Sequence, residues 1–182
     1  MDNKKIQNYV YQSLIDTDTS NLLPIDVTSM AIKLGFAVRE LPLDNLSDNV
    51  IALMLINAMD NDLKQRVNAD KLIVLRKNYD LPHKRFAIAH ELGHYFMHRD
   101  KCADGTNPVF FAQIKDNEQG IEGEACNFAA MLLMDARTFT DEYRKLKKDT
   151  NNRDIDIIRL LAKQFIVPQR AVQRRIEELE LA

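Results

Sequence analysis

The sequence predicts an α+β fold: a small twisted sheet with helices on one face around a helix that contains His-Glu-x-x-His, followed by a helical C-terminal part. Two observations support this fold class. Three short apolar segments of strand length lie between residues 36 and 76. Helical spacing of apolar residues precedes them and returns after residue 120. The order of helix, helix, three strands and helix is typical of a sheet covered by helices.

The elements before the histidine-containing helix follow from local patterns. A short amphipathic helix is expected over residues 4–15. A second helix is expected to run to about Leu34, with Asp26 as its N-cap and Gly35 as its end. Strands are expected at residues 36–41, 50–56 and 71–76.

Composition limits the class of protein. The chain has 182 residues, of which 46% are hydrophobic and 29% are charged, with a net charge of −2. These values are typical of one compact domain or of one domain with a small appendage, and they give no global attraction to nucleic acid. We divide the chain into a core over residues 1–135 and a helical part over residues 136–182 that packs on it.

The cellular location is predicted from three absences in the sequence. No apolar run is long enough to span a bilayer, and the opening residues do not resemble a signal peptide. Cys102 and Cys126 lack the spacing of a metal site, so we expect reduced thiols in a cytoplasmic protein.

Residues 90–94 read His-Glu-Leu-Gly-His within the expected helix. Residues four apart lie on one helix face, about 6 Å apart along the axis, so His90 and His94 can both face one metal ion. Glu91 is then placed to act as the general base that takes a proton from the attacking water. The alternative is two surface histidines on an amphipathic helix. The metal site is favoured because all four histidines lie within residues 83–98, in a segment whose apolar residues make a buried, unpaired Glu costly.

A catalytic zinc ion usually has three protein ligands. Glu122 and Glu124 lie at the start of the next helical segment and can supply the third; we favour Glu124 and keep Glu122 open. His98 is a rival, but it lies one turn beyond His94 and about 40° further around the helix. We interpret His98 as a residue that supports a ligand or as part of the helix surface.

Two features near the expected site remain open in the sequence. The long connection over residues 99–120 contains a strand-like segment at 108–114, and it is expected either to line a substrate cleft or to form a solvent-exposed hairpin. A donor for the developing oxyanion is also needed. The candidates are His83, Tyr95, His98 and Tyr143.

The C-terminal part is expected to contain three helices, at residues 138–148, 155–165 and 169–181, with a break at residues 166–168. Helix, turn, helix is the shape of a DNA-reading motif, and residues 144–175 contain ten Lys and Arg against three Asp. The other interpretation is that these helices close the core and expose a solvated face. We favour the second, because Glu177, Glu178 and Glu180 would repel phosphate.

Three segments together resemble the ImmA/IrrE family of zinc metallopeptidases. They are residues 85–95 around the histidine motif, residues 122–134 (Glu-x-Glu-Ala-x-x-Phe-Ala-Ala-x-Leu-Leu-Met), and residues 23–42. The resemblance covers roughly residues 20–180. It departs from the family at Cys126, where asparagine is usual, and at Asp135, where proline is usual.

The resemblance implies a thermolysin-like core in which one zinc ion is held by His90, His94 and Glu124, with Glu91 as the base. It further implies a bacterial or phage cytoplasmic protease that cleaves a helix-turn-helix repressor and so relieves repression of a mobile element, a prophage or a stress regulon. The alternative hypothesis is a non-proteolytic binding module, an anti-repressor or a DNA-contacting protein, with structural zinc. One half of a toxin–antitoxin pair is a third hypothesis.

Overall fold

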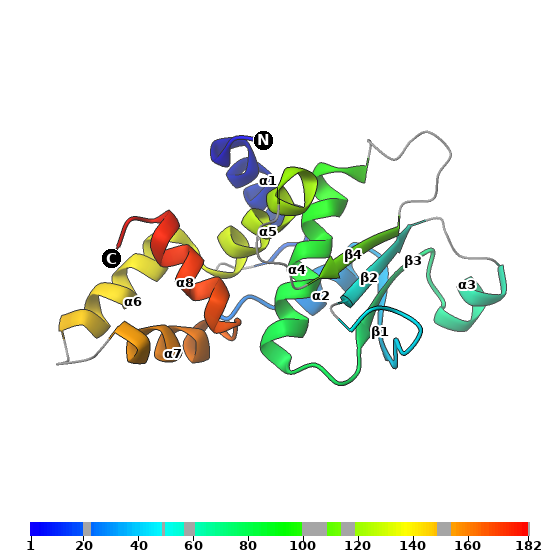
Figure 1. Ribbon diagram of the computed structural model, residues 1–182. Coiled ribbons are helices and arrows are strands. Elements are labelled where there is room, and N and C mark those ends of the chain that lie inside the picture. The colour runs from blue at the N-terminus through cyan, green and yellow to red at the C-terminus, as the bar shows by residue number, and fades with distance from the viewer. Residues whose placement is uncertain are drawn as a thin grey trace.

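The computed structural model describes residues 1–19, 23–48, 50–56, 61–99, 109–113, 119–148 and 154–181. The fold class is confirmed as α+β with a helical C-terminal part (Figure 1). In chain order the elements are α1 (Asn3–Asp16), α2 (Val27–Lys33), β1 (Phe36–Leu41), β2 (Val50–Ile56), α3 (Asn61–Val67), β3 (Lys71–Arg76), α4 (Leu81–Met97), β4 (Val109–Gln113), α5 (Gly120–Leu133), α6 (Ala136–Lys148), α7 (Asp154–Phe165) and α8 (Gln169–Glu178).

The described strands form a mixed sheet in the order β1-β3-β2-β4. β1 runs parallel to β3, with Phe36 opposite Lys71, whereas β2 runs antiparallel to both of its neighbours. The three strands expected from the sequence are therefore present, and the strand-like segment after α4 forms β4 at the edge beside β2.

The two faces of the sheet are covered by different helices. Alternate residues of a strand point to opposite faces. Ile73 and Leu75 of β3 join the main hydrophobic core together with residues of α4, whereas Leu72 and Val74 form a smaller cluster to which Leu63 of α3 packs. The sequence did not predict α3, because Leu63 and Val67 are the only apolar residues among its seven.

The expected ends of α2 are observed, and α4 begins with a cap that the sequence analysis did not predict. Asp26 caps α2 by accepting a hydrogen bond from the backbone N–H of Ser29 at 3.0 Å, and Gly35, with φ of +83°, follows the helix end. Asp80 caps α4 in the same way by accepting from the backbone N–H of His83 at 3.0 Å. The start of the metal-site helix is therefore fixed at the residue after Asp80.

α4 lies between the sheet and α5, and α1 packs on α5 (Figure 1). The C-terminal helices gather at the side of the molecule away from the sheet (Figure 1). Their apolar residues enter the same core as Leu92 and Leu132: Phe139, Leu161, Phe165, Val172 and Ile176. This arrangement fits the interpretation that the helices close the core, while the division of the chain at residue 135 stays a prediction.

Arg175 is a basic residue of the C-terminal part that is buried and does not contribute to its charged surface. Its side chain is 2% exposed, its Nε donates to the carbonyl of Met134 at 3.1 Å, and its guanidinium contacts Glu178 at 2.8 Å.

Within the described ranges, no helix combines the length and the apolar composition that a membrane-spanning segment requires.

Candidate metal centre

α4 buries the face that contains the histidine motif. His90 is 2% exposed, and Glu91 and His94 are 0% exposed. Ile88, Ala89 and Leu92 of the same helix are also buried and belong to the main core. Burial of polar side chains costs free energy unless they have polar partners, so we expect these three side chains to be paired with one another or with groups of a neighbouring element.

The two histidine rings converge as their spacing on the helix predicts. The Nε2 atoms of His90 and His94 lie 3.0 Å apart, and the ring centroids lie 4.8 Å apart at an interplanar angle of 72°. Two nitrogens bound to one tetrahedral zinc ion at about 2.0–2.1 Å would lie roughly 3.3 Å apart. The observed separation is close to this value.

Glu122, from the first turn of α5, completes the cluster. Its Oε2 lies 3.1 Å from Nε2 of His90, and its Oε1 lies 3.4 Å from Nε2 of His94. One donor atom from each of the three residues lies within 4.8 Å of the others, an arrangement that can hold a metal ion. Two imidazoles and one carboxylate are a ligand set that zinc accepts in enzymes, so the residues fit the ion.

Glu124 does not join this cluster, so the geometry favours Glu122, which the sequence kept open, over Glu124 as the third residue that can hold an ion. Its Oε2 lies 2.9 Å from Nε2 of His98, and its Oε1 contacts the amino group of Met1. The physical reason is helix geometry: two residues along a helix correspond to a rotation of about 200°. With Glu122 facing His90 and His94, Glu124 is directed elsewhere.

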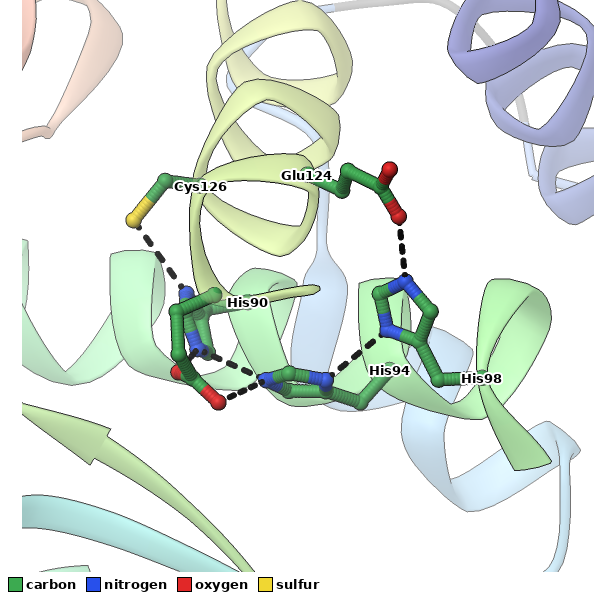
Figure 2. A network of polar contacts seen from close by, with 6 residues as sticks. His90, His94, His98, Glu124 and Cys126 are labelled. Carbon is green, nitrogen blue, oxygen red and sulfur yellow. Dashed lines mark hydrogen bonds and ion pairs between the residues drawn. The ribbon is translucent and has the colours of Figure 1, made fainter. Parts of the chain in front are cut away.

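Two further side chains contact the ring nitrogens that face away from the cluster (Figure 2). Sγ of Cys126 lies 3.3 Å from Nδ1 of His90, and Nδ1 of His98 lies 3.0 Å from Nδ1 of His94. Cys126 is one helical turn after Glu122, so both reach α4 from the same side of α5. The sequence signal for this contact was the four-residue spacing of Glu122 and Cys126.

The electrostatics of the cluster keep the carboxylate ionised. Burial opposes ionisation of Glu122, but its contacts with His90 and His94 outweigh burial and hold the pKa of the carboxyl well below its ordinary value of 4.5. Burial also opposes protonation of both rings. It lowers the pKa of His94, whereas contacts with Cys126 and Glu122 outweigh burial at His90 and raise its pKa well above 6.5.

Glu91 is close to the cluster without being part of it. The residue is fully buried, and its charge is one of the influences that raise the pKa of His90. The three residues that can hold the ion are His90, His94 and Glu122. Glu91 is not among these three residues, and its assignment as the general base stays a prediction.

The four candidate oxyanion donors lie in different environments. The hydroxyl of Tyr95 lies 3.3 Å from Nζ of Lys71 on β3, and the ring of His83 contacts Asp80 at 2.5 Å. Tyr143 is buried in the main core, and His98 contacts Glu124. The oxyanion donor therefore stays unassigned.

Most of the connection over residues 99–120 lies outside the described residues, as does Cys102. Its strand, β4, pairs antiparallel with β2, so Leu53 lies opposite Phe111. The expectation that the connection lines a substrate cleft stays a prediction.

Comparison with known protein families matches most of the chain. A family model described as the IrrE N-terminal-like domain, a peptidase family, matches residues 33–177. This range contains both halves of the candidate site, α4 and α5. No protein in a set of curated sequences matches the chain.

Proposed function

The chain belongs to the family of IrrE N-terminal-like domains, and from this premise we propose that it is a zinc-dependent endopeptidase. The observation that carries the proposal is the cluster of His90, His94 and Glu122, with the fully buried Glu91 next to His90 in α4. A buried site with two imidazoles and one carboxylate leaves a fourth zinc position for a reacting group, as catalytic zinc sites do.

The chemistry divides between the ion and the side chains. A zinc ion in this cluster would act as a Lewis acid toward the scissile carbonyl and would make a nearby water molecule more acidic. Glu91 takes a proton from the attacking water and returns it to the leaving amine of the substrate. His90, His94 and Glu122 hold the ion, and Glu122 is already ionised at neutral pH because both histidines lower the pKa of its carboxyl.

For the substrate we propose a helix-turn-helix transcriptional repressor. Cleavage would relieve repression of a mobile element, a prophage or a stress regulon in a bacterial or phage setting, in the cytoplasm. This finer statement is supported by the resemblance of residues 85–95 and 122–134 to the ImmA/IrrE family.

The test incubates the zinc-loaded protein with the repressor that is encoded nearest to its gene and reads the fragment masses by mass spectrometry. Glu91→Gln is the matched control, because the amide has nearly the same shape but cannot accept the proton. We expect one defined cut with the wild type. We expect the variant to bind zinc normally and to cleave roughly 10²–10⁴ times more slowly, the usual contribution of a general base. Cleavage at the wild-type rate by Glu91→Gln would refute its assignment as the base.

A second candidate is a binding module that acts on a repressor or on DNA by contact. The observation that favours it is the turn between α7 and α8, where Ile166 has φ of +53°, followed by exposed Arg170 and Arg174 on α8. This candidate predicts a stable complex with the repressor that Glu91→Gln leaves intact, without a cut. For DNA, it predicts binding that weakens steeply with salt and is reduced in an Arg170→Ala, Arg174→Ala variant.

A further inference from the structure

His98 and Glu124 lie behind His94 and are not part of the cluster that can hold the ion. The contacts run in one line, from Nε2 of His94, through its Nδ1, to Nδ1 of His98 at 3.0 Å, and from Nε2 of His98 to Oε2 of Glu124 at 2.9 Å (Figure 2). The ring of His98 is 0% exposed, so water does not satisfy its nitrogens.

The direction of these hydrogen bonds follows from what each atom can do. The carboxylate of Glu124 only accepts, so Nε2 of His98 must donate to it. A neutral His98 then has a lone pair on Nδ1, which can only accept. Nδ1 of His94 must therefore donate, and the lone pair of His94 is left on Nε2, the atom that faces Glu122 and His90. The tautomer of a neutral histidine ligand is set in this way by the partner of its other nitrogen.

We propose that His98 and Glu124 are positioning residues for the metal site: together they hold the ring of His94 with its proton on Nδ1 and its Nε2 lone pair directed into the cluster. The proposal rests on the proposed function, since it concerns the site at which zinc would bind. It assigns Glu124 a role that acts through His98 rather than through direct contact with the ion.

The surroundings of the pair support this assignment. The carboxylate of Glu124 is held by two partners, the amino group of Met1 and Nε2 of His98. His98 is the C-cap residue of α4, and its backbone N–H donates to the carbonyl of His94 at 2.8 Å. The backbone thus fixes His98 relative to His94, and Glu124 then fixes the rotation of the His98 ring.

Two variants interrupt the line at different points. His98→Phe keeps a buried ring but removes both nitrogens, and Glu124→Leu removes the acceptor at a side chain that is 15% exposed. The matched control is His83→Phe, a histidine of the same helix that contacts Asp80 and none of the cluster residues. The measurement is zinc affinity of the purified full chain by competition with a chromophoric chelator. We expect His98→Phe to weaken zinc binding by roughly 10–100-fold, Glu124→Leu to weaken it by less, and His83→Phe to leave it unchanged.

The double variant separates a positioning role from direct ligation. If Glu124 acts only through His98, His98→Phe combined with Glu124→Leu binds zinc as weakly as His98→Phe alone. If Glu124 is itself a ligand, Glu124→Leu weakens binding by the same factor in both backgrounds, and the proposal is overturned.

A second measurement reads the tautomer without metal. In ¹⁵N-labelled, metal-free protein, long-range ¹H–¹⁵N spectra are expected to show that the ring of His94 is protonated on Nδ1 in the wild type. In Glu124→Leu this preference for Nδ1 is expected to be lost. Because the measurement uses Glu124→Leu, the proposal stays testable if His98→Phe does not fold. Zinc affinity and tautomer that are both unchanged in Glu124→Leu would refute the proposal. A wild type that binds no zinc would instead refute the proposed function, and the tautomer would still decide whether the pair orients His94.

Discussion

Gly93 of α4 packs directly against the backbone of Ala125 of α5. A β-carbon on Gly93 would lie 3.2 Å from both the Cα and the carbonyl oxygen of Ala125, and 3.2 Å from Cβ of Phe128. Two of these three atoms are backbone and cannot move aside alone. The missing side chain of Gly93 therefore allows α5, which contains Glu122, to pack this closely against α4.

Gly93→Ala is expected to weaken zinc binding and to destabilise the metal-free protein. Alanine is favoured over glycine in a helix by about 1 kcal/mol, but overpacking against a rigid neighbour typically costs 1–3 kcal/mol. The two measurements are urea unfolding of the metal-free protein and a zinc competition titration. A protein about 1 kcal/mol more stable, with unchanged zinc affinity, would show that α5 does not need this close approach.

Replacement of each candidate carboxylate in turn by an amide tests which of the two is the third ligand. Glu122→Gln is expected to lower zinc affinity by more than the roughly 10–100-fold that loss of a supporting group causes, because the amide is a poor ligand. Glu124→Gln is the matched control and is expected to stay within a few-fold of the wild type, since its amide oxygen still accepts from His98. The opposite order of affinities, measured by chelator competition, would restore Glu124 as the ligand.

Zinc binding is expected to release a proton. Although burial opposes it, contact with Cys126 and Glu122 raises the pKa of His90 well above 6.5, so at neutral pH the metal-free ring holds a proton that zinc must displace. Affinity should therefore fall about tenfold per pH unit as the pH is lowered below that pKa. Calorimetry at pH 7 in buffers of different ionisation enthalpy counts the released proton. A zinc-binding heat that does not depend on the buffer would contradict this prediction.

Cys126→Ala is expected to reduce this proton release, because it removes one of the contacts that raise the pKa of His90. It also removes the partner that lies 3.3 Å from Nδ1 of His90, so zinc affinity should fall. Cys126→Asn, which introduces the residue usual in the ImmA/IrrE family, supplies an amide oxygen at this position and should keep the affinity. Equal zinc affinity for both variants would show that the contact does not orient the ligand.

Asp26 gives a prediction about stability and pH. Hydrogen bonds from Ser29 lower the pKa of its carboxyl below the ordinary value of 3.8. The folded pKa lies below the unfolded one, so the stabilisation is fully present above about pH 3.8 and is lost as the pH falls through the folded pKa. Asp26→Ala should reduce the free energy of unfolding by about 1 kcal/mol at pH 6, and by less at pH 3. If Asp26→Ala lowers the free energy of unfolding, measured in urea, by the same amount at both pH values, the charge of Asp26 does not contribute to the cap.

The sequence alone predicted the helix of the site and the convergence of two of its candidate ligands. Residues four apart must share a helix face, so the convergence of His90 and His94 follows from local geometry, and the structure confirms it with Nε2 atoms 3.0 Å apart. The strands and the caps at Asp26 and Gly35 were also predictable, because they depend on periodicity and on the preferences of neighbouring residues. α3 was missed because two apolar residues are too few to show a helical period.

Only the tertiary structure distinguishes the positions of Glu122 and Glu124. Both lie in the first turns of α5, and nothing local distinguishes them as ligands. The rotation of α5 about its own axis as it packs on α4 turns Glu122 toward His90 and His94 and directs Glu124 to His98. For His98 the sequence left two interpretations open, a residue that supports a ligand or part of the helix surface, and its contacts with His94 and Glu124 favour the first.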